Sequence, residues 1–290
     1  MTIKISAIAV WAIILFGCNH PQNTNMNTVA QPTFTSGYAP IGALKMYYEI
    51  HGTGGIPLVL LHGGGSTIQT TFGNILDSLA KNRQVIAVEL QAHGHTADID
   101  RPLSFEQDAD DVAALLNYLN IKKADLFGFS NGGNTAMQVG IRHPGIVNKL
   151  VIASAFYQRD GMVPGFFDWM QHASLENMPM PLQTAYLQID SNKQHLQAMH
   201  DRDRDRMVQF RDWPDEMLKS IMSPVLLISG DKDVVLTEHT LKMSHFIPKA
   251  ELLIVPGNHG SFIGEICNVK SGSKQPQVMV AMIEEFLDGQ

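Results

Sequence analysis

The sequence predicts an α/β fold, in which a mostly parallel central sheet is flanked by helices. Continuous apolar runs of strand length, such as residues 57–61 and 84–90, suit parallel strands that are buried on both faces. Helical patterns alternate with these runs, which is typical of a sheet with helices on both faces. The chain has 290 residues with 44% hydrophobic content, which is enough for one large domain with a sizeable core.

Each element has its own signal. Residues 38–51 alternate between apolar and polar positions, which predicts a strand. Ser104 and Gln107 form a capping box at the start of a helix that runs to about residue 120. The helix expected over 134–142 is stopped by Pro144. The remaining strands are expected at 123–129, 149–154, 224–229 and 251–255, and the remaining helices at 72–81 and 278–287.

Residues 155–220 depart from this alternation, and we expect them to form a helical lid inserted after the sixth strand. They contain no buried-strand run, whereas methionine and aromatic residues become frequent. Thioether side chains adapt to varied apolar shapes, so this segment is expected to supply the walls of a substrate pocket. The residues predicted to line it are Met162, Phe166, Trp169 and Met170. The alternative is that they only pack the lid onto the core, which is assigned to 37–154 and 221–290.

Charge and composition exclude some classes of partner. The net charge is −7 and no basic patch stands out, which argues against nucleic acid. A neutral or apolar small molecule suits this composition better than a polyanion. The alternating charges at 201–206 are interpreted as a solvated helix face or surface segment without a role in a site.

The first residues are expected to direct export and not to join the fold. Residues 5–16 form an apolar run too short to span a bilayer comfortably, which predicts a signal peptide over 1–17. The run ends in Leu15-Phe16-Gly17-Cys18, which resembles the lipobox of bacterial lipoproteins and implies lipidation of Cys18. Residues 18–36 would form a flexible tether, because 19–31 are rich in Asn, Thr, Gln and Pro. The resemblance implies a lipid-anchored protein of the bacterial cell envelope. It also slightly favours the outer membrane, because Asn19 stands where lipoproteins kept at the inner membrane usually carry Asp. A plain membrane anchor or an uncleaved signal is the alternative.

The motif Gly128-Phe129-Ser130-Asn131-Gly132 follows an apolar run and precedes a helical pattern. This order predicts a nucleophile elbow, in which a serine is held on a sharp strand-to-helix turn. The two glycines fit the close passage of strand and helix. A glycine-rich turn with an incidental serine is the alternative, so the interpretation depends on partners elsewhere in the chain.

Those partners follow later strands in the order that an elbow requires, which is serine, acid and then histidine. The apolar run 226–229 leads into Asp231 and Asp233, and the run 252–255 leads to His259. Ligands of open α/β sheets bind at the carboxyl ends of strands, where all of these residues are expected. From spacing alone, either aspartate qualifies.

Taken together, these segments resemble the α/β-hydrolase superfamily over nearly all of residues 38–290. The matching segments are 62–64, 89–95, 128–133, 230–233 and 259. In this family the acid is the last residue of Gly-x-x-Asp, which implies Asp233 and not Asp231. The resemblance also implies that the amides of Asn131 and Gly64 stabilise the oxyanion, with Gly65 as the alternative to Gly64. The loop at 89–95 lacks the arginine that is common in the family, which leaves the subfamily open.

The resemblance implies a hydrolase that cleaves carboxylic esters of a small, partly apolar substrate through a Ser130-His259-Asp233 triad and an acyl-enzyme. We expect no metal or organic cofactor. The expected partners are a small-molecule ester or lactone and, through the N-terminal lipid, a membrane. A lactonase, a C–C bond hydrolase or a cofactor-free perhydrolase would use the same triad. The remaining alternative is a non-catalytic ligand-binding protein.

Overall fold

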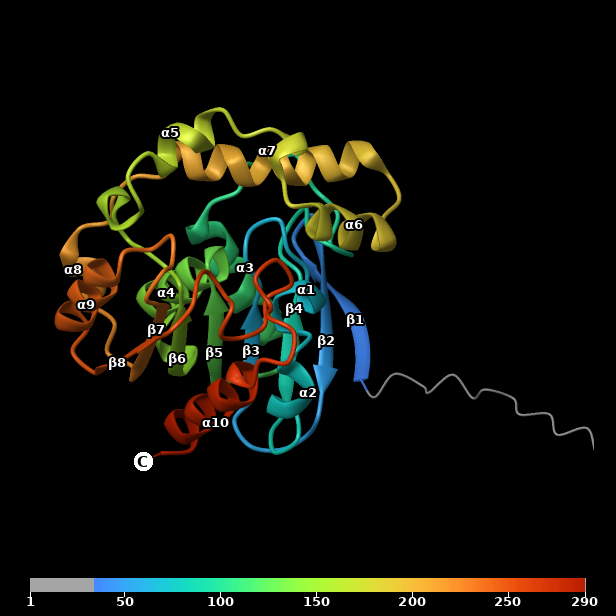
Figure 1. Cartoon of the computed structure of the whole chain (residues 1–290). Helices are drawn as coiled ribbons and strands as arrows, with labels where there is room; N and C mark the ends of the chain where they lie inside the picture. The colour runs from blue at the N-terminus through green and yellow to red at the C-terminus, as the bar shows by residue number, and fades with distance from the viewer. Residues whose placement is uncertain (1–33, 290) are drawn as a thin grey trace, which may run out of the picture. The chain divides into compact units, whose positions relative to one another are not determined.

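A computed structural model describes residues 34–289, which form an eight-stranded sheet with helices on both faces (Figure 1). The strands are β1 (Phe34–Ile41), β2 (Leu44–His51), β3 (Leu58–Leu61), β4 (Val85–Val88), β5 (Ala124–Phe129), β6 (Val147–Ala153), β7 (Val225–Gly230) and β8 (Ala250–Val255). Their order is β1-β2-β4-β3-β5-β6-β7-β8. β2 pairs antiparallel with β1 and β4, and every other neighbouring pair is parallel. The predicted α/β fold with a mostly parallel sheet is confirmed.

The helices divide the core into a layer on each face of the sheet. The α-helices are α1 (Ile68–Phe72), α2 (Leu76–Leu79), α3 (Phe105–Tyr118), α4 (Asn131–Arg142), α5 (Phe166–Gln171), α6 (Met180–Ile189), α7 (Lys193–Gln209), α8 (Asp215–Lys219), α9 (Thr237–Phe246) and α10 (Gln275–Asp288). One buried cluster joins the sheet to α3, α4, α8 and α9, and a second joins it to α1, α2 and α10. Central strands are therefore buried on both faces, as their continuous apolar runs predict.

The N-terminal strands differ from the prediction in one respect. The alternating segment 38–51 is a hairpin, in which β1 and β2 are joined by a turn at Gly42, where φ is 58°. β1 begins at Phe34, so residues 34–36 pair with β2, although the sequence placed them in the tether. Their Thr, Ser and Phe side chains carry no strong burial signal, because β1 is an edge strand with one neighbour.

The helix expected over 72–81 is divided into α1 and α2. Between them, the Asn74 side chain donates a hydrogen bond to the Gly264 carbonyl at 2.6 Å. This contact spans 190 residues of sequence, so periodicity cannot reveal it. The expected apolar face is nevertheless buried, since Ile75, Leu76 and Leu79 lie in the core.

The segment between β6 and β7 contains short 3-10 turns at Arg159–Gly161 and Leu175–Asn177 as well as α5, α6, α7 and α8. In Figure 1, α5, α6 and α7 lie at the top, beyond the ends of the parallel strands, and α7 packs against both α5 and α6. α8 behaves differently, because it packs against α9 and α4 of the core. The part of the segment that covers the strand ends is thus the part from α5 to α7.

The expected signal peptide at 1–17, the lipidation site Cys18 and the tether up to residue 33 lie outside the described residues. Within residues 34–289, no helix is long and apolar enough to cross a membrane.

Candidate active site

Ser130 stands alone on the turn between β5 and α4, with φ 54° and ψ −122°. This conformation is strained for a residue with a side chain and persists only where packing imposes it. The neighbouring glycines show how tight the packing is. A Cβ atom on Gly128 would lie 2.1 Å from the Gly132 carbonyl oxygen, and one on Gly132 would lie 2.1 Å from the Leu61 carbonyl oxygen. The strand-to-helix turn of a nucleophile elbow is therefore present, and it lifts the Ser130 hydroxyl above the strand ends.

The three residues expected from chain order form one hydrogen-bonded chain. The Ser130 Oγ and His259 Nε2 atoms are 3.0 Å apart, and His259 Nδ1 lies 2.7 Å from Asp233 Oδ1. If Nδ1 carries the proton and donates it to Asp233, Nε2 is left to accept from the serine hydroxyl. Asp233 also accepts a hydrogen bond from the Ser154 hydroxyl at 2.5 Å. Asp231 takes no part, because it is exposed and accepts from the Gly257 amide.

Mutual interaction shifts the pKa values of this pair in opposite directions. Burial raises the pKa of the Asp233 carboxyl, but the charge of His259 and its hydrogen bond outweigh burial and hold that pKa below its usual range. Burial lowers the pKa of the His259 imidazole, whereas the charge and hydrogen bond of Asp233 raise it above its usual value. The Glu265 carboxylate raises it further. The imidazole is consequently a stronger base than a free one, paired with an ionised carboxylate.

The loop that follows β3 leaves one of its amides without an acceptor. The Gly63 amide donates to Thr71 Oγ1 at 3.3 Å, and the Gly65 amide donates to the Asp203 carboxylate at 2.6 Å. Among the described residues, the Gly64 amide has no acceptor. Of the two glycines that the sequence left open, Gly64 is therefore the one with a free donor.

A second free amide belongs to Asn131, the first residue of α4. The first amides of a helix have no partner within the helix, and that of Asn131 has none elsewhere in the described residues. Asn131 and Gly64 are neighbours that line the same cavity as Ser130, and a Cβ atom on Gly64 would be 2.4 Å from the Asn131 side-chain nitrogen. Two residues with unused amides thus line the cavity that Ser130 faces, and the amide of Asn131 lies at the positive end of a helix dipole.

Comparison with known proteins agrees with this geometry. Residues 58–264 match the Alpha/beta hydrolase family. The chain belongs to this family. It is 29% identical to serine hydrolase BPHL from Homo sapiens over 212 residues, which are 69% of this chain and 70% of that protein. Over 112 residues it is 35% identical to a 2-hydroxymuconate semialdehyde hydrolase from a Pseudomonas species, covering 36% of this chain and 38% of that one.

Solved structures show the same fold at low sequence identity. A serine hydrolase involved in carbazole degradation superposes with a TM-score of 0.71 at 20% identity, covering 89% of this chain and 100% of that one. The enol-lactonase from Burkholderia xenovorans superposes with a TM-score of 0.68 at 18% identity, covering 87% of this chain and 99% of that one. At these identities the similarity establishes the fold and not the substrate.

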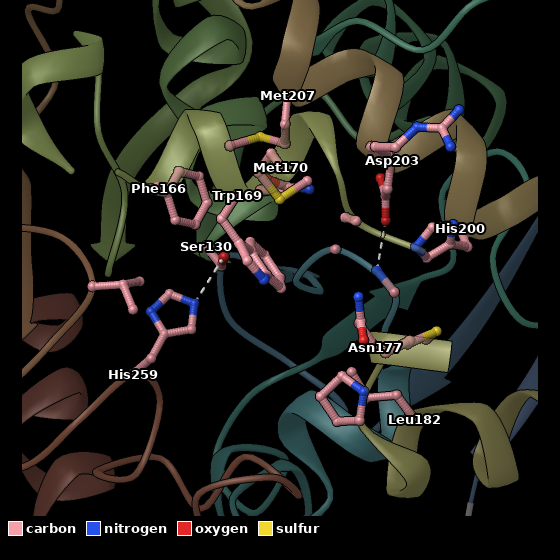
Figure 2. A pocket seen from close by; sticks show the side chains of 18 of the residues that line it. Ser130, Phe166, Trp169, Met170, Asn177, Leu182, His200, Asp203, Met207 and His259 are labelled. Carbon is pink, nitrogen blue, oxygen red and sulfur yellow. Dashed lines mark hydrogen bonds between the residues drawn. The ribbon is translucent and has the colours of Figure 1, made fainter. Parts of the chain in front are cut away.

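The elbow serine opens into a cavity of about 490 Å³ between the strand ends and the helices from α5 to α7. The residues predicted from sequence to form its walls, Met162, Phe166, Trp169 and Met170, all line it. In Figure 2, Phe166, Met170 and Met207 lie above Ser130 and Trp169 lies beside it, whereas Asp203, His200 and Asn177 lie toward the right of the view. The cavity therefore combines an apolar part near the serine with a more polar part below α7.

Some residues around this site were not found by sequence reasoning. Ser154 and Glu265 act on the acid and the histidine from loops that show no motif. The interpretation of 201–206 as a solvated face is wrong for Asp203 and Arg206, which are only 8% and 6% exposed. A usable signal exists in the spacing, because Leu196, Met199, Asp203 and Arg206 follow each other at helical intervals of three and four and all are buried.

No group of three or more His, Cys, Asp or Glu side chains arranged to hold a metal ion occurs in residues 34–289.

Proposed function

We propose that the protein is a serine hydrolase that cleaves carboxylic esters of small, partly apolar substrates through an acyl-enzyme. The observation that carries this proposal is the continuous chain from Asp233 through His259 to the Ser130 hydroxyl, which faces a cavity beside two free amides. This arrangement supports the proposal, because a serine hydroxyl needs a base, an orienting acid and an oxyanion site for acyl transfer.

The proposed reaction has two half-reactions. Ser130 Oγ attacks the ester carbonyl while His259 Nε2 takes its proton, and the Gly64 and Asn131 amides hold the oxyanion. When the tetrahedral intermediate collapses, the C–O bond breaks and His259 returns the proton to the leaving alcohol. Water then attacks the acyl-enzyme and gives a proton to His259, which passes it back to Ser130 as the acid leaves. Asp233 orients the imidazole and stabilises its charged form throughout.

The walls of the cavity indicate an apolar group on the substrate. Phe166, Met170 and Met207 lie over the serine, and Trp169 is 53% exposed toward solvent. Methionine and aromatic walls favour acyl or alcohol groups of variable apolar shape over ionic ones. A volume of about 490 Å³ suits a small-molecule ligand.

A p-nitrophenyl ester series of increasing acyl length tests this function. We expect turnover that rises from acetate to a medium-length chain and then declines as the cavity fills. Negligible turnover of every ester, with Ser130 still reactive toward a fluorophosphonate, would instead favour a lactonase or a C–C bond hydrolase. The 35% identity to a 2-hydroxymuconate semialdehyde hydrolase over 112 residues supports that second candidate.

We expect Glu265→Gln to shift the acid limb of the pH profile to lower pH. His259 must be neutral to accept the serine proton, so kcat/KM falls as the pH drops through its pKa. The Glu265 carboxylate raises the pKa of His259, and removing its charge therefore lowers that pKa and extends activity into more acidic solution. The measurement is kcat/KM against pH on one ester. Glu285→Gln removes a charge from the exposed face of α10 and should leave the limb in place. An unchanged limb in the Glu265 variant would contradict the assignment.

We also propose that the protein is exported and held at the bacterial cell envelope by a lipid on Cys18, with the outer membrane slightly favoured. The support is the apolar segment at 5–16, the lipobox-like residues 15–18 and the polar tether that follows. Cys18→Ser is expected to move the protein from the membrane fraction to the soluble fraction of cells. Continued retention on membranes by this variant would rule out the lipid anchor.

A further inference from the structure

A buried group of charges lies below the lid helix α7, close to the loop after β3. Arg206 donates to Asp108 of α3 at 2.7 Å and also to Asp203, one turn earlier on α7. Asp203 in turn lies 2.9 Å from His93 Nε2 and accepts from the Gly65 amide at 2.6 Å. All four charged or titratable side chains are at most 8% exposed as residues. Buried charges are costly unless they are paired, so each partner holds the others in place.

Within this group of charges, Asp203 is ionised and therefore acts only as a hydrogen-bond acceptor. Burial raises the pKa of the Asp203 carboxyl, but the charges of His93 and Arg206 outweigh burial and hold its pKa well below the usual range. His93 Nδ1 lies 2.8 Å from the Gln91 carbonyl and Nε2 lies 2.9 Å from Asp203, so both nitrogens donate when the ring is the charged imidazolium. Asp203 favours this form, because burial lowers the pKa of His93 but the charge and hydrogen bond of Asp203 outweigh burial and raise that pKa above its usual value. Nε2 lies 3.3 Å from the Gly65 nitrogen, and in its protonated form it cannot accept from that amide. The Gly65 amide then has Asp203 as its acceptor, and this charge-assisted bond is among the short ones at 2.6 Å.

The contact with Gly65 bears directly on the oxyanion site. Gly65 adopts φ 66°, so the chain turns sharply immediately after Gly64. The Gly65 nitrogen and the Gly64 carbonyl belong to one peptide plane, and anchoring the nitrogen on Asp203 restricts rotation of that plane. Asp203 Oδ2 would also lie 3.2 Å from a Cβ atom on Gly64. Figure 2 shows this bond as a dashed line from the Asp203 carboxylate to the loop backbone, across the cavity from the Ser130–His259 contact.

We propose that Asp203 is a positioning residue for the oxyanion site: by accepting from the Gly65 amide, it orients the loop so that the Gly64 amide stays aimed at the substrate oxygen. This inference rests on the proposed function, because it assigns a role within the same acyl transfer. Asp203 belongs to α7, so the lid covers the cavity and also supplies a hydrogen-bond acceptor that helps to form the oxyanion site. Consecutive glycines such as Gly63, Gly64 and Gly65 have little backbone conformational preference of their own. An acceptor from outside the loop is therefore needed to fix the orientation of its peptide planes.

The test is Asp203→Asn, which keeps the shape of the side chain and removes its charge. We expect kcat to fall about 10- to 100-fold, which does not exceed the loss seen when an oxyanion donor is deleted. KM should change by less than about threefold, because the Gly64 amide acts mainly on the transition state. The affinity for an alkylboronic acid should fall in parallel with kcat, because its adduct with the serine places an oxygen in the oxyanion site. Rates are counted per serine that reacts with a fluorophosphonate, so partial unfolding does not mimic the effect.

The matched control is Asp108→Asn, which removes a carboxylate from the opposite end of the same charged group. It leaves the Asp203–Gly65 bond in place, so we expect a lower melting temperature but kcat and boronate affinity within about threefold of the wild type. Equal losses of kcat in both variants, or an unchanged kcat in Asp203→Asn, would overturn the proposal in favour of a lid anchor alone.

If Asp203→Asn does not fold, Asp203→Glu decides the question. It keeps the charge opposite Arg206 and His93 but carries the carboxylate one methylene farther, away from its place beside Gly65. A fall in kcat and boronate affinity with an unchanged KM supports the positioning role, and wild-type values of both contradict it. A different result would contradict the proposed function itself: in that case Ser130 of the wild-type protein would not react with the fluorophosphonate at all.

Discussion

Replacing Ser130 with alanine is expected to lower kcat/KM on any accepted ester by on the order of 10⁵- to 10⁶-fold, the scale seen when a triad nucleophile is deleted. The acyl-enzyme forms on the Ser130 hydroxyl, which stands on the turn between β5 and α4 and contacts His259 Nε2 at 3.0 Å. The fold should survive, since serine and alanine are equally strained at φ 54° and Ser130 makes its side-chain hydrogen bond only to His259. The measurement is ester turnover together with fluorophosphonate labelling, which should disappear.

The control for this prediction is Ser220→Ala. Ser220 is exposed at the end of α8, and its hydroxyl donates only to the Met217 carbonyl. This variant removes the same oxygen atom without touching the cavity, so labelling and turnover should stay at the wild-type level. Persistent turnover in Ser130→Ala, with a matching circular dichroism spectrum, would show that another group is the nucleophile and would reject the proposed mechanism.

The meeting of Ser130, Asp233 and His259 was predictable because it follows from topology. Each residue comes within a few positions of the end of a strand, and parallel strands bring their carboxyl ends to one edge of the sheet. Local signals were enough to find those strands, since each is a short apolar run. β5 and β7 are buried on both faces, whereas β8 is an edge strand that is only partly buried. Chain order then brought together residues that are up to 129 positions apart, without any knowledge of the lid.

The role of the lid in the site was not predictable in the same way. Asp203 lies in an alternating run of charges, a pattern that is usually solvated. Its partners Gly65 and His93 come from the loops after β3 and β4, and Arg206 of the same run pairs with Asp108 of α3. Nothing in the run itself says which of its charges will find a buried partner. The helical interval from Met199 to Asp203 puts Asp203 on the buried face of α7. A pattern of burial does not reveal, however, that Asp203 accepts a hydrogen bond from the Gly65 amide. Such contacts depend on how α7 docks, which is a property of the whole fold.

Gly132→Ala is expected to destabilise the protein by at least about 3 kcal/mol, at the upper end of the usual cost of overpacking. The added Cβ atom would lie 2.1 Å from the Leu61 carbonyl oxygen and 2.5 Å from that of His62. Both are backbone atoms at the end of β3, so no rotamer change relieves the contact, and α4 must move away from the strand. That movement shifts Ser130 and Asn131, and activity should fall with stability. Chemical denaturation followed by fluorescence measures the first effect, and ester turnover the second.

Gly145→Ala is the control that separates the steric conflict at Gly132 from the general effect of replacing glycine by alanine on stability. Gly145 lies in the 3-10 turn Pro144–Ile146, and a Cβ atom there meets no atom within 4 Å. With no steric conflict, the substitution restricts mainly the unfolded chain and should stabilise the protein by up to about 1 kcal/mol. The two variants are thus expected to shift the free energy of unfolding in opposite directions. A Gly132→Ala protein as stable as the wild type would mean that strand and helix do not pass as closely as described, and the argument for a strained, packing-held serine would lose its basis.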